Sequence, residues 1–176
     1  MRRVLGRGKM KRKNKLIGLL LILVGILSYL GMAIAAKLEH KQEVNNTINT
    51  LQEFKYISLD GNTRSLEKGN KLKVIFFFNP ECEHCQAEAK LLSEHATHFE
   101  KANVYFLSTE GLEAIKKFAE DYHLETFDVG KVDYMQVAYP MGVNTFPMCF
   151  IYSPEGKLLK QYKGEVKIEA ITNYLK

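Results

Sequence analysis

The sequence FFFNPECEHCQAE, residues 76–88, decides how the rest of the chain folds. It begins in a continuous apolar run, which is typical of a strand covered on both faces, and Asn79 and Pro80 then disfavour further strand pairing. Cys82 and Cys85 follow at i and i+3 in the first turn of a predicted helix, close enough to form a disulfide without moving the backbone far. Three interpretations are open: a redox-active disulfide, a metal clamp or two ordinary core cysteines.

The two cysteines differ in their predicted chemistry. Backbone N–H groups and the positive end of the helix dipole stabilise a thiolate at Cys82, which makes this sulfur the nucleophile. Cys85 lies one turn further into the helix, where it is more buried and is placed to attack a mixed disulfide on Cys82. A cationic His84 would favour the thiolate and an oxidising protein. The acids that oppose this effect are Glu81, Glu83 and Glu88, so the choice between reductant and oxidant stays open.

The remaining histidines and the third cysteine argue against a metal or haem site. A structural zinc ion needs about four ligands, and outside the C-x-x-C segment the nearest candidates are His95 and His98 on the same predicted helix. Covalent haem attachment requires a histidine directly after the second cysteine, where Gln86 stands. Cys149 lies in the apolar run 148–152 and is predicted to be a buried free thiol, with a third redox role as the alternative.

Outward from this segment, the apolar pattern predicts alternating strands and helices. Residues 72–78 form the central strand, and the helix that starts at Cys82 continues to Phe99. The other predicted elements are strands at 54–61, 104–107, 148–152 and 157–162, a helix over 112–122 capped by Thr109, and a closing helix near 168–175. Residues 125–143 are predicted to be irregular, with one helical turn near 134–139. Crossover helices make the first strands parallel, so the sequence predicts an α/β fold with a mixed sheet and an antiparallel C-terminal edge.

The N-terminal part has a different composition. Residues 1–15 contain eight Lys and Arg, whereas residues 16–36 carry no charge. As a helix, this apolar stretch would extend roughly 30 Å, enough to cross a bilayer. Flanking positive charge then assigns residues 1–15 to the cytoplasm and the rest of the chain to the other side. A cleaved signal peptide is the alternative, because Ala33 and Ala35 resemble a cleavage site, but the apolar stretch exceeds the usual length, which favours an uncleaved signal anchor.

The region after the apolar stretch is slightly acidic. From Lys37 onward, 20 acidic residues stand against 17 basic ones, so the positive charge is local and no nucleic-acid partner is expected. Residues 37–53 are polar, with apolar positions at near-helical intervals, which suits a stalk and equally a dimer seam. Residues 54–176 form the predicted domain, in a compartment where disulfides persist.

Several of these features together resemble a known family. The C-x-x-C after a central strand, the β-α-β-α-β-β-α order and the sequence TFP at 145–147 resemble the thioredoxin fold. The sequence YISLDGNTRSLEKGNKLKVIFFF, residues 56–78, resembles the membrane-anchored TlpA/ResA-type thioredoxin-like proteins. The resemblance implies a thiol-disulfide oxidoreductase facing outward (periplasmic) from a bacterial cytoplasmic membrane, often a reductant, for example of apocytochrome c cysteines. It implies protein thiol or disulfide substrates, a membrane electron donor or acceptor, and no cofactor beyond the disulfide.

The resemblance also assigns roles to single residues. Cys82 and Cys85 match the redox pair of the family. Pro147 matches its cis-proline, which faces the disulfide and offers backbone to an incoming peptide. Glu88 matches the glutamate beneath the cysteines, where it would exchange a proton with Cys85, and an ordinary solvated helix residue is the alternative.

The sequence departs from the family pattern at two positions. Glu81 precedes the first cysteine, where the family usually has Trp, and Phe76 stands where thioredoxin has a buried carboxylate. Glu88 is then the main candidate for a proton acceptor. Two other functions remain open: a redox-inert binding module that uses the groove near Pro147, and a peroxiredoxin-like peroxidase.

Overall fold

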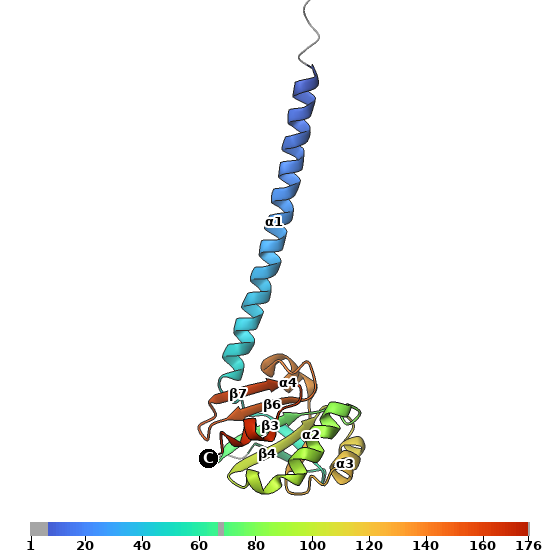
Figure 1. Cartoon of the computed structure of the whole chain (residues 1–176), viewed down its shortest axis with the longest axis vertical. Coiled ribbons are helices and arrows are strands. Elements are labelled where there is room, and N and C mark those ends of the chain that lie inside the picture. Colours follow the sequence, from blue (N-terminus) through green and yellow to red (C-terminus); the bar gives the residue numbers. More distant parts are fainter. Residues whose placement is uncertain (1–6, 67–68, 176) are drawn as a thin grey trace, which may run out of the picture. The chain divides into compact units, whose positions relative to one another are not determined.

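The structure, a computed structural model, describes residues 7–66 and 69–175 (Figure 1). Its first element is the long helix α1 (Arg7–Ile48). Within it, Ile17–Glu39 is long and apolar enough to cross a membrane, with a mean hydropathy of 2.5, and its leucine and isoleucine side chains are exposed. The predicted apolar helix is therefore confirmed as a candidate membrane span. Residues 44–175 belong to a second, compact unit.

The compact unit is built on one mixed sheet of seven strands in the order β2-β1-β5-β4-β3-β6-β7. The strands are β1 (Lys55–Ser58), β2 (Thr63–Ser65), β3 (Leu72–Phe77), β4 (Ala102–Ser108), β5 (Asp128–Val132), β6 (Met148–Tyr152) and β7 (Leu158–Lys163). Strands β3, β4 and β5 run parallel, whereas β6 and β7 add an antiparallel edge on one side and β1 and β2 add another. The predicted mixed sheet with a parallel centre is confirmed.

Helices α2 (Glu83–Glu94), α3 (Leu112–Asp121) and α5 (Ile168–Thr172) cover one face of this sheet (Figure 1). They enclose the first core cluster, whose buried sheet residues are Val74, Phe76, Ala102, Val104, Phe106, Val129, Cys149 and Ile151. Helix α4 (Tyr134–Met141) and the residues before β1 cover the other face. They enclose the second core cluster, whose sheet residues are Tyr56, Ile75, Phe77, Tyr105, Leu107, Val132, Met148, Phe150 and Tyr152. Alternate residues of β3 thus point to opposite faces.

The segment that joins α1 to the sheet packs against the compact unit. Ile48 is buried in the second core cluster. The backbone N–H of Leu51 donates to the carbonyl of Gly156 (2.7 Å), and the N–H of Leu158 donates to the carbonyl of Asn49 (2.9 Å). Residues 48–51 therefore form part of the folded unit, although the polar pattern of residues 37–53 suggests a stalk.

Two strands are missing from the sequence prediction. Strand β2 has three exposed residues and gives no apolar pattern. Strand β5 contains Asp128, Gly130 and Lys131, and its sequence predicts an irregular segment, yet it lies between β1 and β4. Its Gly130 is required by close packing, because a Cβ there would lie 2.5 Å from the carbonyl oxygen of Ile57. The helical turn predicted after it is confirmed as α4.

Two details of the predicted helices are wrong. Helix α2 ends at Glu94, and a 3-10 helix, η1 (Ala96–Phe99), replaces its predicted last turn. Helix α3 has Gly111 as its N-cap, without a side-chain hydrogen bond, so Thr109 does not cap it. Helix α4 is capped by Asp133, whose carboxylate accepts from the backbone N–H of Met135. These differences leave the predicted parallel centre of the sheet unchanged.

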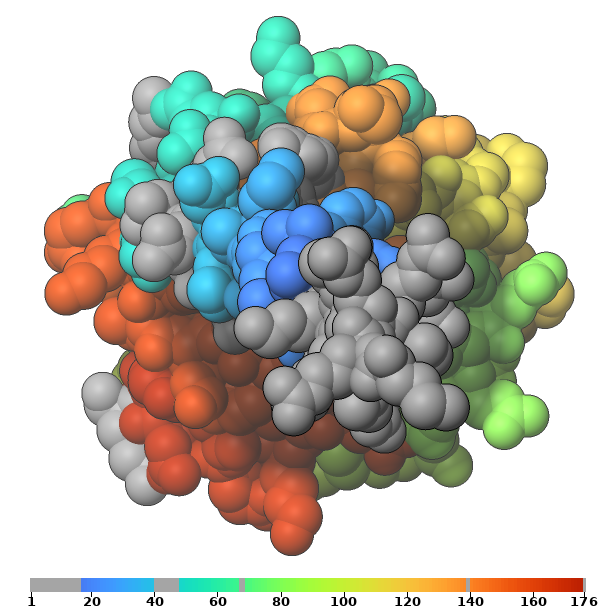
Figure 2. Space-filling view, turned by 90° about the horizontal axis from the view of Figure 1, so that it is seen from above, coloured from blue at the N-terminus to red at the C-terminus, as the bar shows by residue number. Residues whose placement is uncertain are grey.

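The start of β1 contacts α4 on the surface of the compact unit. The backbone N–H of Lys55 donates to Oε1 of Gln136 (3.3 Å). Figure 2 shows the two segments side by side, with β1 and its neighbours in cyan and α4 in orange. Helix α4 is therefore hydrogen-bonded to the sheet at the start of β1.

Candidate active site

Cys82 and Cys85 lie where β3 leads into α2. After β3, the backbone N–H of Glu81 donates to Oδ1 of Asn79 (2.8 Å), and the N–H of Cys82 donates to the carbonyl of the same asparagine (3.1 Å). This turn ends the strand and starts the helix. Cys82 is the N-cap of α2 in an extended conformation, so its side chain stands at the positive end of the helix dipole.

The two thiols have different environments. Cys82 is partly exposed, whereas Cys85 is 2% exposed and packs into the first core cluster. Both are free thiols in this structure. Burial raises the pKa of Cys85 well above its ordinary value, and the nearby Cys82 and Glu88 raise it further. Cys82 thus has an accessible sulfur, whereas Cys85 is a buried thiol that holds its proton tightly.

Pro147 lies across from Cys82. The Phe146–Pro147 peptide bond is cis. The Sγ atom of Cys82 donates to the carbonyl oxygen of Phe146 at 3.8 Å. The loop before β6 therefore meets the first cysteine, although 64 residues separate them in the chain.

Glu88 lies one turn beyond Cys85 on the buried side of α2. It is 4% exposed, so its interpretation as a solvated helix residue is wrong. Its Oε1 atom accepts a hydrogen bond from the backbone N–H of Val166 (3.3 Å). Burial raises the pKa of Glu88 to about 8, the bond from Val166 partly offsets this rise, and the negative charge of Glu165 adds to it. This carboxyl group therefore keeps its proton to a higher pH than an ordinary glutamate does.

A hollow of about 300 Å³ adjoins Glu88 at the surface, between α2 and the segment before α5. It is lined by Ala87, Glu88, Leu91, Glu165, Val166 and Lys167. The carboxyl group therefore has a route to solvent despite its low exposure.

His84 projects from the first turn of α2. Its side chain is 74% exposed, and its Nδ1 atom lies 2.5 Å from Oε1 of Glu165. Sequence reasoning did not single out Glu165 or Val166. Glu165 lies 81 residues after its partner His84 in the sequence, and Val166 lies 78 residues after its partner Glu88. No local sequence pattern around residues 164–167 indicates either contact.

Cys149 lies in the interior of β6. It is fully buried in the first core cluster and pairs in register with Phe76 of β3. Burial raises the pKa of the Cys149 thiol well above its ordinary value, and the charge of Glu88 adds to the rise. The prediction of a buried free thiol is confirmed.

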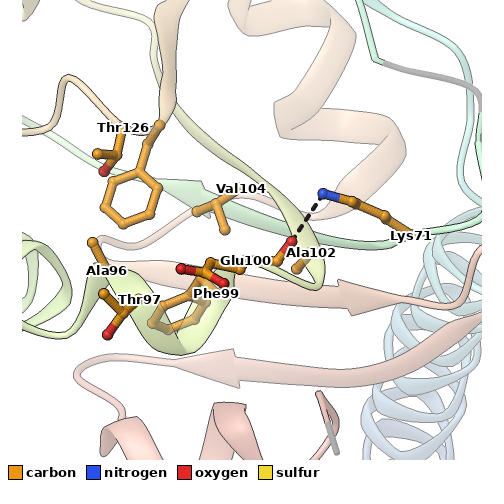
Figure 3. A pocket seen from close by; sticks show the side chains of 9 residues that line it. Lys71, Ala96, Thr97, Phe99, Glu100, Ala102, Val104 and Thr126 are labelled. Carbon is orange, nitrogen blue, oxygen red and sulfur yellow. Dashed lines mark hydrogen bonds between the residues drawn. The ribbon is translucent and has the colours of Figure 1, made fainter.

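Residues able to bind a metal do not form a cluster in the described part of the chain. Among the residues whose side chains the structure describes, no three His, Cys, Asp or Glu come close enough together to hold a metal ion. A second hollow of about 300 Å³ lies between η1 and the start of β4, where Nζ of Lys71 donates to the carbonyl of Glu100 at 2.8 Å (Figure 3). Phe99, Ala102 and Val104 line this hollow with apolar side chains, and none of its lining residues is a cysteine or histidine. The cysteine region is therefore the best candidate for the active site.

Comparisons with known proteins show the family of the chain. The model of the AhpC/TSA family matches residues 48–167. Thiol-disulfide oxidoreductase ResA of Bacillus subtilis is 28% identical over 176 residues, with 94% of each chain covered, and ResA of Bacillus thuringiensis subsp. konkukian is 25% identical over 170 residues, with 94% of this chain and 97% of the relative covered.

Solved structures show the same fold. MTB dsbF superposes with a TM-score of 0.63 at 21% identity, over 73% of this chain and 94% of the other. StoA of Bacillus subtilis superposes with a TM-score of 0.61 at 13% identity, over 73% of this chain and 99% of the other. The chain therefore belongs to the AhpC/TSA family, has the thioredoxin-like fold and is homologous to the ResA thiol-disulfide oxidoreductases.

Proposed function

We propose that this thiol-disulfide oxidoreductase is a membrane-anchored reductant that exchanges disulfides with protein substrates through Cys82 and Cys85. The observation that supports it most is the contrast between the two thiols. Cys82 is partly exposed at the start of α2, and Cys85 is buried one turn behind it. A sulfur that must meet a protein substrate needs access, whereas the sulfur that releases the product needs only to reach its neighbour.

The proposed exchange has two steps. The Cys82 thiolate attacks one sulfur of a substrate disulfide, so a Cys82–substrate bond forms and the other substrate sulfur leaves as a thiolate and takes up a proton. Cys85 then gives up its proton and attacks the Cys82 sulfur, which forms the Cys82–Cys85 disulfide and releases the second substrate thiolate. The substrate gains two electrons and the protein loses two. A dithiol donor at the membrane must restore the pair.

Glu88 is the proposed acceptor of the Cys85 proton. Its ionised form raises the pKa of the Cys85 thiol. Because the pKa of Glu88 is about 8, a minority of these carboxyl groups is ionised at neutral pH, and this ionised fraction, which grows as pH rises, accepts the proton. The adjoining hollow gives the proton an exit. Glu88 thus takes the place of the buried carboxylate that thioredoxin has at the position of Phe76.

Pro147 is the proposed docking position for the substrate backbone. The carbonyl of Phe146 contacts the Cys82 sulfur, which supports a position along the loop at 146–147 for a peptide whose sulfur bonds to Cys82. The resemblance to TlpA/ResA-type proteins supports this role. It also supports a substrate such as the cysteines of apocytochrome c.

The proposed location is the outer side of a bacterial cytoplasmic membrane. The eight basic residues at 1–15 precede the apolar helix, and the positive-inside rule then assigns the N-terminus to the cytoplasm. A periplasmic or otherwise extracytoplasmic domain suits a chain whose chemistry requires a disulfide to persist.

Substitution of each cysteine in the full-length, detergent-solubilised chain tests the proposal. We expect Cys82→Ser to abolish the reduction of a disulfide-bonded peptide by a dithiol donor, because the nucleophile is gone. Cys85→Ser should accumulate a mixed disulfide with the peptide, visible as added mass on a non-reducing gel or by mass spectrometry. Cys149→Ala is the matched control and should retain turnover.

Two results would contradict the proposal. Unchanged turnover in Cys82→Ser would exclude this cysteine as the nucleophile. Direct consumption of hydrogen peroxide at a rate that exceeds peptide reduction would instead favour the peroxidase chemistry found elsewhere among thioredoxin-like proteins.

A further inference from the structure

Three consecutive residues after β7 contact three different parts of the candidate site. The backbone N–H of Gly164 donates to the carbonyl of Pro147 (2.8 Å). The Glu165 carboxylate meets Nδ1 of His84 (2.5 Å), and the N–H of Val166 donates to Glu88 (3.3 Å). We call residues 164–166 the site loop.

The site loop holds the Glu165 backbone at a fixed place. Gly164 has a φ of +84°, a conformation that glycine adopts without steric cost, and it is tied to the loop before β6. Val166 is buried in the first core cluster and is tied to α2 through Glu88. Because both neighbours are anchored, only the Glu165 side chain must be ordered to reach His84, which lowers the entropic cost of the contact.

The contact bears directly on the chemistry of the cysteines. A cationic imidazole between two cysteines stabilises the Cys82 thiolate, which favours the dithiol form and makes the couple more oxidising. A carboxylate at 2.5 Å cancels much of the field of that cation. The side chains are 74% and 52% exposed, so water and salt screen the effect and keep it modest.

We propose that Glu165 is a positioning residue for the cysteine pair: it holds His84 and withdraws the imidazole charge from Cys82, which keeps the couple more reducing than its C-E-H-C sequence alone would make it. This inference rests on the proposed function. It resolves the conflict in the sequence between a histidine that favours an oxidant and a protein family that often contains reductants.

Redox equilibration of the full-length protein in detergent with glutathione buffers at about pH 6, where a histidine side chain is largely cationic even without a carboxylate partner, tests this role. We expect Glu165→Gln to shift the equilibrium toward the dithiol by about two- to fivefold, the range typical of an exposed ion pair. The shift should decrease as salt is raised from about 0.05 to 0.5 M. Glu169→Gln is the matched control, because it removes the same charge from an exposed position on α5.

The same titration in a His84→Gln background separates the possible outcomes. If Glu165 acts through His84, Glu165→Gln should then shift the equilibrium no more than Glu169→Gln does. An unshifted equilibrium in the single variant, or an equal shift with and without His84, would overturn the inference. If the wild-type cysteines never change state in the buffer series, the proposed function itself fails and this inference fails with it.

Discussion

The two faces of the sheet are formed by the same strands but differ in the chemical groups that they bury. On the face covered by α2, α3 and α5, the first core cluster includes the thiols of Cys85 and Cys149 and encloses the buried carboxyl of Glu88. On the opposite face, the buried members of the second core cluster are aliphatic, methionine and aromatic side chains. Strand β3 contributes large apolar residues to both. Apart from Cys149, which lies in β6, the difference therefore lies in the covering elements.

The comparison shows how the helix creates the candidate site. Helix α2 starts at the end of the central strand and brings Cys82 to its N-terminus, while Cys85 and Glu88 lie on its buried side one and two turns later. Helix α4 covers the other face with Val137 and Met141 and contributes neither a thiol nor a buried carboxyl. We infer that the first face combines stability with chemistry, whereas the second provides mainly stability.

Equivalent truncations on the two faces give the largest expected effect. Phe76 stacks on Phe106 in the first cluster (4.8 Å between ring centroids), and Phe150 packs edge-on against Phe77 in the second (5.7 Å). Either Phe→Ala change should lower the free energy of unfolding by about 3–5 kcal/mol, as measured by urea denaturation. Only Phe76→Ala should also change the thiol-disulfide equilibrium. An equal change in Phe150→Ala would break the distinction between the faces.

Glu88 gives the next largest effect, through pH. Its pKa is raised to about 8 in the folded chain, whereas a glutamate in an unfolded chain titrates near pH 4.3. Between these values the folded state keeps a proton that the unfolded state releases, so stability is greatest at the acidic end and falls as pH rises toward 8. Glu88→Gln should remove this fall, which amounts to at most a few kcal/mol.

Urea denaturation at pH 5 and pH 8 measures this effect, with the exposed Glu169→Gln as the control. The wild type and the control should lose stability over this range, and Glu88→Gln should lose less. The same loss in all three proteins would mean that Glu88 is not the group responsible.

Gly130 tests the close packing of β5 against β1. A Cβ at this position would lie 2.5 Å from the carbonyl oxygen of Ile57 and 2.6 Å from the Tyr56 ring. Gly130→Ala should therefore separate the strands and destabilise the fold by about 1–3 kcal/mol. Thermal unfolding followed by circular dichroism measures the change. A variant as stable as the wild type would show that β1 moves away at no cost.

Tyr152 on the second face gives the smallest expected effect. Its hydroxyl is buried, and it has no hydrogen-bond partner among the residues that the structure describes. Removal of a buried, unpaired hydroxyl removes its desolvation cost, so Tyr152→Phe should raise the free energy of unfolding by up to about 1 kcal/mol. A loss of stability in the urea titration would instead reveal a partner for the hydroxyl.

The sequence predicts the part of the fold that local patterns encode. The apolar run of β3, the Asn79–Pro80 turn and the spacing of Ala89 and Leu92 suffice to place Cys82 at the start of a helix. The sequence does not predict β5, because this segment contains few residues that favour strands. It forms a strand because it pairs with β1 and β4 on either side. Tertiary context overrides propensity there.

The candidate site shows the same limit. Cys82, Cys85 and Glu88 share one helix, so their spacing alone indicates that they lie together. Glu165 reaches His84 only because β7 and the site loop bring residues that are distant in the sequence to helix α2. The spacing of residues along the chain cannot predict a contact of that kind. The burial of Glu88, which changes its chemistry, also depends on this distant loop.

The central claim is that Cys82 and Cys85 form one redox couple. The most direct test equilibrates the full-length protein in a series of thiol-disulfide buffers, traps thiols with a mass-tagged alkylator and locates the tags by mass spectrometry. We predict that Cys82 and Cys85 change state together as a two-electron couple, with a midpoint closer to about −270 mV than to about −120 mV, while Cys149 stays reduced throughout. A pair that never changes state, or a couple that includes Cys149, would contradict the account.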